Sequence, residues 1–455
     1  MTILAVLLSL SIGLLIAVFA ARLGTRSERR FVAFGIVAHG GAGIMQLLIL
    51  RFIYGNDGDM DTYFRFGGRL AELIASAPAT VLPATILTFL QLPAELPMDL
   101  PGAGLSAHSM YSLAALFSFV FQGSRLAITL TLSWFSFFNK WLIYLVLSRS
   151  LPARLRPRLA FGVLLFPSAV FWSCGLLKET VAFCGFGFLF YGTWLLLKGS
   201  SRAWGVALVV FGSIPVLIVK PYIMIPAGMA VVAWIYTQHR PASDVRIPIT
   251  PKRVFMTLLG IAAVFLIIRV VGEIAPRFAI ENIVDSTTSI QTAGQNHARS
   301  TTMYRIVDPN AGVAGQIAAA PLALLTAMYR PLPFEATSAL VFINSLETFS
   351  LLMLTVVVIR RRGVVGSWRA IRGSPALSYA FAFVVIFGVA VGLGSTNLGS
   401  LSRYRMPMIP FFAALLLCLS SRPPVARRAQ PSPRRRRTQM KVVSSPANAR
   451  RGTAT

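Results

Sequence analysis

The fold is decided by residues 3–61, which read ILAVLLSLSIGLLIAVFAA (3–21), RLGTRSERRF (22–31), VAFGIVAHGGAGIMQLLILRFI (32–53) and YGNDGDMD (54–61). Two apolar runs of about 20 residues enclose a basic loop, and the second run leads into an acidic turn. A run of that length can cross the hydrocarbon core of a bilayer, which is about 30 Å thick. Such runs recur along nearly the whole chain, so the sequence predicts an all-α polytopic membrane protein.

The composition agrees with a membrane domain. Of the 455 residues, 55% are hydrophobic and only 13% are charged, about half the share usual in soluble proteins. The net charge of +28 comes from short basic clusters between the apolar runs and from one tail. This distribution is typical of the positive-inside rule rather than of a nucleic-acid interface. We therefore expect no nucleic-acid partner. We also expect Cys174, Cys184 and Cys418, which lie in apolar sequence, to be reduced packing residues.

The basic loops predict the topology. The loop 22–30 is expected to be cytoplasmic, which places the acidic turn 54–61 outside. Stretches 79–98 and 108–122 are short or rich in proline, and they either lie in the outer leaflet as interfacial helices or both cross the membrane. The first reading gives about 11 transmembrane helices and the second gives up to 13. The eleven expected spans are 3–21, 32–53, 125–148, 158–173, 178–196, 203–219, 221–237, 253–271, 336–360, 376–394 and 404–421.

These assignments divide the chain into two parts. Residues 1–421 form the expected transmembrane catalytic domain, with a first external loop at 54–124 and a large external loop at 273–335. Residues 422–455 form a basic tail that we expect to be disordered and cytoplasmic. Further basic loops at 149–158, 198–202, 239–253 and 360–372 are expected on the cytoplasmic side. The polar segment 273–310 is either a mobile cover over a site or a plain connection.

The acidic residues gather on the expected outer face. Of the fifteen Asp and Glu residues, only Glu28 and Asp244 fall in loops assigned to the cytoplasm, and Glu347 falls inside a span. Acidic residues contribute little to orientation, so topology alone does not require this bias. A functional site on the external face would explain why the acidic residues gather there.

The first cluster of candidate site residues is DGDMDTY (57–63), which contains Asp57, Asp59, Asp61 and Tyr63. Carboxylates at this density can act as a general base or bind a divalent cation such as Mg²⁺ or Mn²⁺, with Asp59 and Asp61 as the candidate ligands. The alternative is a solvated turn that caps the following amphipathic helix.

Two further clusters follow. In FPSAVFWSCGLLKE (166–179), the proline and glycine break the apolar run and bring Lys178 and Glu179 to the outer turn. Broken helices in membranes normally line a cavity, although a lysine at a membrane interface can equally be a structural anchor. In LSRYRMPMIP (401–410), Arg403 and Arg405 flank Tyr404 on the outer side. Arginines there suit a phosphate group or anchor the chain at headgroup level.

Weaker candidates are Lys220 in KPY (220–222), Arg330 and Glu335 in YRPLPFE (329–335), and Glu347 within a span. For each of them a structural role is as compatible with the sequence as a functional one. Walker, dinucleotide-binding and HExxH patterns do not occur in the sequence, so we do not expect an energy-coupled pump.

Taken together, these features resemble GT-C-type glycosyltransferases, which include the protein-mannosyl and lipid A aminoarabinose transferases. The resemblance rests on the acidic first loop, the amphipathic helix, the broken helix pair and the late RYRMPMIP segment. It implies an enzyme that transfers a sugar from a polyprenyl-phosphate donor to a glycan, lipid or protein acceptor on the non-cytoplasmic face of the bacterial inner membrane. Two departures from the family are that the acidic loop follows the second span and that a C-terminal soluble domain is lacking.

Carried onto this sequence, the resemblance gives Asp57, Asp59, Asp61 and Glu179 catalytic roles. It implies that Lys178 and Glu179 meet the donor and that Arg403 and Arg405 hold the lipid phosphate. Apart from the resemblance, the expected substrate-binding residues also include Tyr63, Lys220, Arg330, Glu335 and Tyr404. Two other functions remain open. A polysaccharide polymerase or ligase of the polyprenyl-linked export pathway would also use a large external loop and external arginines. A transporter or flippase for lipid-linked saccharide would use the same face without catalysis.

Overall fold

The computed structural model describes residues 2–102, 104–238, 251–279, 282, 285–286, 304–308 and 311–421, and contains no strand among them. Helices α1 to α18 belong to one compact unit, residues 1–420. The first half contains α1 (Thr2–Leu23), α2 (Arg29–Phe52), α3 (Asp59–Ser76), α4 (Pro78–Phe89), α5 (Leu105–Val120), α6 (Arg125–Ser150), α7 (Arg156–Ala160), α8 (Pro167–Phe171) and α9 (Lys178–Lys198). The second contains α10 (Arg202–Val219), α11 (Met224–Thr237), α12 (Pro251–Ile274), α14 (Gly312–Tyr329), α15 (Ala339–Arg372), α16 (Pro375–Leu393), α17 (Leu398–Tyr404) and α18 (Ile409–Leu419).

Nine helices in the described part of the chain are long and apolar enough to cross a membrane. They are α1, α2, α6, α9, α10, α12, α14, α15 and α16. The prediction of an all-α, multi-pass membrane protein is confirmed by these helices. Residues on α1, α2 and α12 leave large apolar side chains uncovered, among them Ile3 (77% exposed), Val37 (73%) and Phe265 (62%), as expected for surfaces that face lipid.

The structure differs from the expected spans at four places. The stretches 221–237 and 404–421 are not among the nine long helices and contain only shorter apolar helices, Pro221–Thr237 and Met406–Leu419. The stretch 158–173 is divided between α7, a π-helical turn η3 (Phe161–Leu165) and α8. Phe166 has an extended backbone and Pro167, which lacks an N–H, starts the next helix. Conversely, α14 is an 18-residue apolar helix where we expected part of the external loop 273–335. Its sequence contains Gln316 and Pro321, which made it look less like a membrane span.

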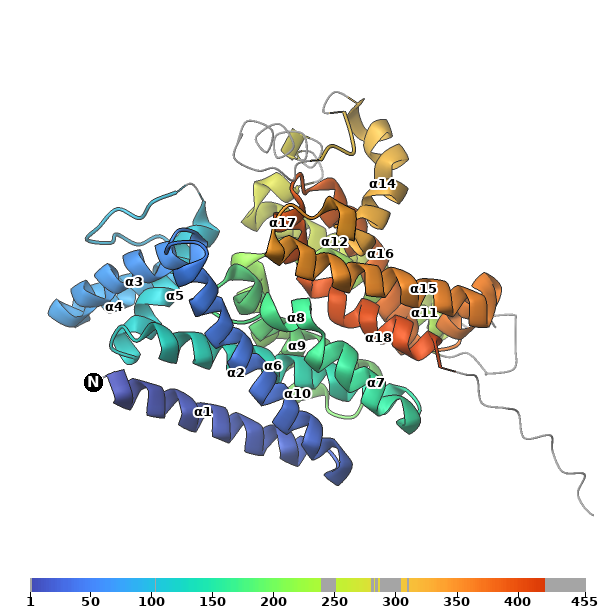
Figure 1. Cartoon of the computed structure of the whole chain (residues 1–455), viewed down its shortest axis with the longest axis horizontal. Coiled ribbons are helices and arrows are strands. Elements are labelled where there is room, and N and C mark those ends of the chain that lie inside the picture. Colours follow the sequence, from blue (N-terminus) through green and yellow to red (C-terminus); the bar gives the residue numbers. More distant parts are fainter. Residues whose placement is uncertain are drawn as a thin grey trace, which may run out of the picture. The chain divides into compact units, whose positions relative to one another are not determined.

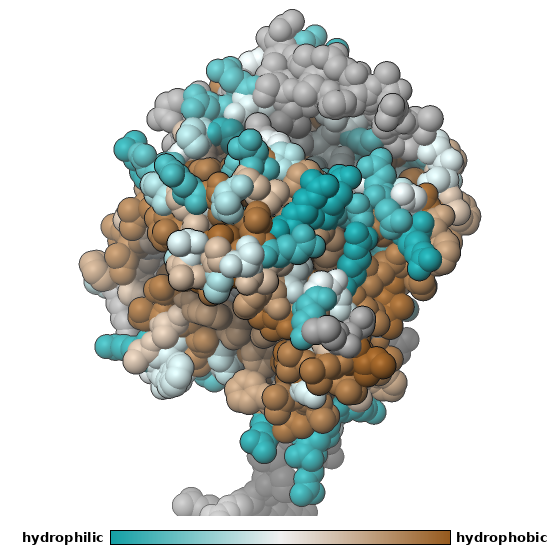
Figure 2. All heavy atoms as spheres, turned by 90° about the vertical axis from the view of Figure 1, so that its left-hand side faces the viewer, coloured by the Kyte–Doolittle hydropathy of each residue, from teal (hydrophilic) through white to brown (hydrophobic). Residues whose placement is uncertain are grey.

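The stretches that we found ambiguous contain short helices. Helices α4 and α5 have 12 and 16 residues, fewer than the roughly 20 needed for a full crossing. Both pack with the amphipathic α3 into a layer beside the end of α2 (Figure 1). The face that carries α3 and α4 is mixed, with hydrophilic residues gathered in its upper part and hydrophobic residues over much of the rest (Figure 2).

The core is built around α6, most of whose residues are buried on every side. Helices α1, α2 and α9 pack against it (Figure 1). The helices approach closely at Gly187 of α9, where a Cβ would lie 2.2 Å from the Asn139 carbonyl oxygen, so only glycine fits. A second group, α11, α14, α16 and α18, joins this core through aromatic contacts such as Phe190 with Tyr379.

Three expected features lie wholly or largely outside the described residues. They are the basic loop 239–253, most of the polar segment 273–310 and the tail 422–455.

Candidate functional site

A cavity of about 410 Å³ lies where the ends of α2, α3, α8, α15 and α17 meet. Its walls are apolar on the sides of α2 and α15, where Ile49, Leu50, Leu340 and Val341 contribute side chains. Most polar groups come from the acidic turn and from α17, and α2 and α15 add one amide side chain each. The lining polar and aromatic side chains are Gln46, Tyr54, Asp57, Asp59, Phe171, Trp172, Asn344, Ser400, Ser402, Arg403 and Tyr404. The cavity therefore joins the first and the last of the candidate clusters.

The acidic turn reaches the cavity because its backbone turns sharply after α2. Gly55, Asn56 and Gly58 all have positive φ angles, of 60°, 59° and 129°, which glycine and asparagine tolerate best. Asp59 then starts α3, with Asp61 also in its first turn. Carboxylates are favourable there because the helix N-terminus carries partial positive charge.

The three aspartates have different surroundings. Asp57 is exposed, lines the cavity and forms no ion pair with any described residue. An oxygen of Asp59 lies 2.8 Å from Nη1 of Arg403. Asp61 is buried and instead accepts from Nη1 of Arg125 at 2.8 Å, and it does not line the cavity.

The aspartates do not make a cluster of metal ligands in this arrangement. The described residues contain no group of three or more His, Cys, Asp or Glu side chains placed to hold a metal ion. The pairing of Asp59 and Asp61 with two different guanidinium groups takes their oxygens in two directions. The divalent cation considered at Asp59 and Asp61 therefore stays a prediction, and binding it would require these side chains to leave their arginines.

Glu179 is brought to the inner side of the cavity by the break between α8 and α9. Gly175 in this break has a φ of +75°, and a Cβ there would lie 3.1 Å from Cε of Met60. The Glu179 side chain is fully buried and contacts two cations. Its Oε1 accepts from Nζ of Lys220 at 2.7 Å, and its Oε2 lies 2.8 Å from Nε of Arg403.

Asp59, Arg403, Glu179 and Lys220 thus form a chain of alternating charges, which we call the charge ladder. Side-chain exposure falls along it, from 56% at Asp59 to 18% at Arg403 and 0% at Glu179. Burial lowers the pKa of Arg403 and of Lys220, but the neighbouring carboxylates outweigh this effect and both pKa values end above their ordinary range. Both cations are therefore charged at neutral pH.

Three tyrosines surround the charge ladder. Tyr404 lines the cavity, and its ring centroid lies 4.7 Å from Nζ of Lys220. The hydroxyl of Tyr222 accepts from the same nitrogen at 3.2 Å. Tyr63 is buried against Tyr111 with ring centroids 5.4 Å apart. Burial raises the pKa of Tyr63, so this phenol stays neutral and contributes packing and a hydrogen-bonding group.

Lys178 and Arg405 do not line the cavity. Lys178 donates to Oγ of Ser106 at 3.0 Å. Arg405 is fully buried and donates to the carbonyl oxygens of Ala327 and Arg330 and to Oδ1 of Asn344. Burial lowers its pKa to about 10. We had expected Arg405 to hold the phosphate, but the structure places it as a tie between segments.

Arg330 and Glu335 form the ion pair that their spacing suggested. Nε of Arg330 donates to Oε1 of Glu335 at 2.8 Å. Burial raises the pKa of Glu335, but hydrogen bonds from Arg330 and Leu332 outweigh it and the net pKa is lowered. Glu347 accepts from the backbone N–H and the hydroxyl of Ser168, and so ties α15 to α8. These three side chains also lie outside the cavity lining.

The sequence reasoning missed a buried polar cluster on α6. Nζ of Lys140 lies 3.2 Å from Nε2 of His39, and it donates to the Ala169 carbonyl and to Oγ of Ser173 at 2.5 Å each. The ammonium group therefore has three acceptors, and it ties α2 and α6 to the end of α8. A lysine inside an apolar run was the available signal, because intramembrane charges need partners.

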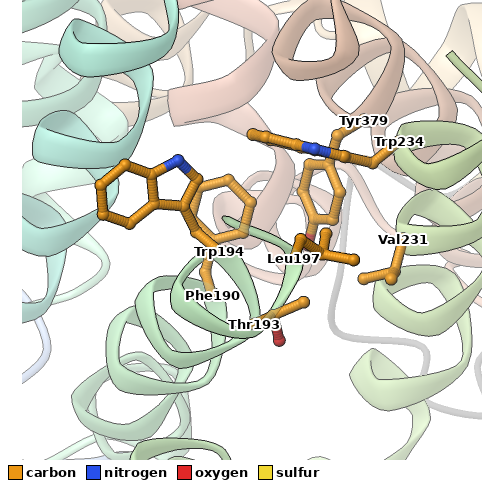
Figure 3. Close-up of a pocket in the computed structure, with 7 residues that line it drawn as sticks. All are labelled: Phe190, Thr193, Trp194, Leu197, Val231, Trp234 and Tyr379. Carbon is orange, nitrogen blue, oxygen red and sulfur yellow. The ribbon is translucent and has the colours of Figure 1, made fainter. Parts of the chain in front are cut away.

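A second, much smaller void of about 10 Å³ lies among aromatic side chains of α9, α11 and α16. Phe190, Trp194, Trp234 and Tyr379 surround it (Figure 3). It has room for about one water-sized sphere and lacks the convergent polar groups that a water needs. We regard it as imperfect packing.

Comparison of the chain with protein-family models, with curated proteins and with solved structures yields no match. A function for this chain is therefore inferred from the residues and the geometry of the cavity.

Proposed function

We propose that this chain is a membrane glycosyltransferase of the GT-C type that uses a polyprenyl-phosphate-linked sugar in the assembly of cell-envelope glycan or polysaccharide. In this proposal the protein lies in the bacterial inner membrane, the cavity opens on the non-cytoplasmic face and the C-terminus is cytoplasmic. The observation that carries it is the meeting of Asp57 and Asp59 with Arg403 at one amphipathic cavity.

The cavity suits such a donor chemically. Its apolar walls on α2 and α15 match an isoprenoid chain, and Arg403 at its polar end matches a phosphate. A guanidinium group holds phosphate oxygens through paired hydrogen bonds. The volume of about 410 Å³ is in the range of ligand pockets, and it is enough for the phosphate, the sugar and the first part of the lipid.

The carboxylates suit the acceptor. Asp57 is exposed in the cavity and is without an ion-pair partner among the described residues, so its oxygens are available to an acceptor hydroxyl. As the acceptor oxygen bonds to the sugar carbon, its proton passes to the carboxylate. The bond between the sugar and the phosphate oxygen breaks, and Arg403 stabilises the charge left on the lipid phosphate.

The test is sugar transfer in membranes that contain the protein, with radiolabelled undecaprenyl-phosphate hexoses and pentoses as donors. Asp57→Asn and Arg403→Met should each lower the rate at least about a hundredfold, as loss of a general base or of an oxyanion partner does. Glu72→Gln, which changes an exposed carboxylate of α3 outside the cavity, should keep full activity.

Other results would point to the rival functions. Loss of activity with Arg403→Met, while Asp57→Asn stays active, would favour a polymerase or ligase. Movement of the lipid-linked sugar across the bilayer without a new glycosidic bond would identify a flippase. Full activity of both Asp57→Asn and Arg403→Met would refute the proposed site.

A further inference from the structure

Arg403 is not a free cation at the cavity. Its Nη1 is paired with Asp59 at 2.8 Å, and its Nε contacts Glu179 at 2.8 Å. Glu179 is in turn paired with Lys220. The charge ladder therefore contains two carboxylates and two cations, and it presents no net charge to an incoming anion.

The two carboxylates on Arg403 are not equivalent. Glu179 is fully buried and is held by a second cation, so removing it from Arg403 would leave a buried carboxylate with a less complete set of partners, which is costly. The side chain of Asp59 is 56% exposed, and Arg403 is the only ion-pair partner that the described residues give it. It can turn into water at a lower cost than Glu179, since its side chain is already more than half exposed and its carboxylate is hydrated once it leaves the arginine.

We propose that Asp59 occupies the position of the ligand's phosphate when the cavity is empty, and that an anionic phosphate group displaces it from Arg403. Glu179 and Lys220 stay in place and hold the guanidinium plane. The departure of Asp59 opens Nη1 and Nη2 of Arg403 as a fork for two phosphate oxygens. When the anion leaves, Asp59 returns and neutralises the arginine.

This displacement rests on the proposed function, because the phosphate is that of the proposed donor. It changes the affinity of the cavity for an anion, which can be measured apart from sugar transfer. A carboxylate that ligates a metal or positions substrate strengthens binding, so its neutralisation weakens affinity. A pure general base has little effect on affinity. A carboxylate that competes with the ligand has the opposite effect, because its neutralisation raises affinity for the anion.

The experiment measures binding of three probes to the purified full-length protein in detergent by calorimetry. The probes are farnesyl phosphate, inorganic phosphate and the uncharged alcohol farnesol. Asp59→Asn should lower the dissociation constant for farnesyl phosphate about tenfold and leave that for farnesol unchanged. The arm with inorganic phosphate separates a site for any phosphate, in which both anions gain, from one that needs the lipid chain as well.

Asp57→Asn is the matched control, because Asp57 lines the same cavity but does not contact Arg403. It should raise the affinity much less than Asp59→Asn does. Adding Arg403→Met to Asp59→Asn should abolish the gain. Asp59→Ala provides a second variant in case the amide keeps a hydrogen bond to the arginine.

Unchanged or weaker binding of farnesyl phosphate by both Asp59 variants would overturn the inference, as would an equal gain from Asp57→Asn. The proposed function is tested by a different measurement, and it is wrong if no sugar transfer is found. If Asp59→Asn binds the anion more tightly but the protein shows no transferase activity, the displacement of Asp59 is supported and the proposed enzymatic function is wrong.

Discussion

At the scale of single residues, sequence spacing and helix geometry together explain why one residue of each predicted pair reaches the cavity and the other does not. Asp59 and Asp61 are two apart on α3, as Arg403 and Arg405 are at the end of α17. Residues two apart on a helix point about 200° away from each other. One member of each pair therefore reaches the cavity, while the other is turned to a separate partner.

The buried pair Lys220–Glu179 gives a stability prediction at this scale. Glu179→Gln should destabilise the protein by about 3–5 kcal/mol, because it leaves the buried Lys220 without a carboxylate partner. Lys220→Met should destabilise it less, because Glu179 keeps its contact with Arg403. The double variant should lose less than the sum of the two. Unfolding in detergent, followed by tryptophan fluorescence, measures the three values.

Glu95→Gln is the control for these variants, since Glu95 is exposed and has no ion pair with a described residue. Its free energy of unfolding should match that of the unmodified chain. Strictly additive losses in the Lys220 and Glu179 variants would mean that the two side chains act independently.

At the scale of elements, glycines and prolines set the positions of the functional groups. Pro167 and Gly175 break the helical path ahead of α9 and bring Glu179 beneath the cavity. The position of α3, which carries Asp59, depends on its close approach to α5. A Cβ on Gly67 would lie 2.4 Å from Cβ of Ala114, whereas one on the neighbouring Gly68 would meet nothing within 4 Å.

These two glycines form a matched pair for a prediction about α3. Gly68→Ala should stabilise the protein by about 0.5–1 kcal/mol, because alanine favours the helix. Gly67→Ala should destabilise it by about 1–3 kcal/mol through overpacking against α5, and it should weaken farnesyl phosphate binding by moving Asp59. Thermal unfolding and calorimetry test both effects. Equal behaviour of the two variants would show that the contact between α3 and α5 does not position the site.

At the scale of the whole molecule, the charge ladder joins segments that are far apart in the chain. Asp59 and Arg403 are 344 residues apart, and Glu179 and Lys220 come from between them. If the proposed topology is right, all four lie on the non-cytoplasmic side. The three native cysteines are buried or partly buried, so they should react little with a reagent that labels an introduced cysteine.

An accessibility experiment tests this topology. Asp57→Cys, at the cavity, should react in intact cells with a maleimide that cannot cross membranes. Ser200→Cys, at the exposed turn between α9 and α10, should react only after the cells are permeabilised. The reverse pattern would place the cavity in the cytoplasm, where the proposed donor sugar is not presented.

The amino-acid sequence was enough to predict an all-α membrane protein, because the length and apolarity of a helix that faces lipid are local properties. It also indicated which residue types could carry charge chemistry, and that Pro167 and Gly175 interrupt the apolar run. Grouping Asp59 with Asp61, and Arg403 with Arg405, assumed that neighbours in sequence share a site. Which carboxylate meets which cation became known from the three-dimensional structure. Those pairings depend on where each helix starts and on the packing of segments hundreds of residues apart, so local patterns do not fix them.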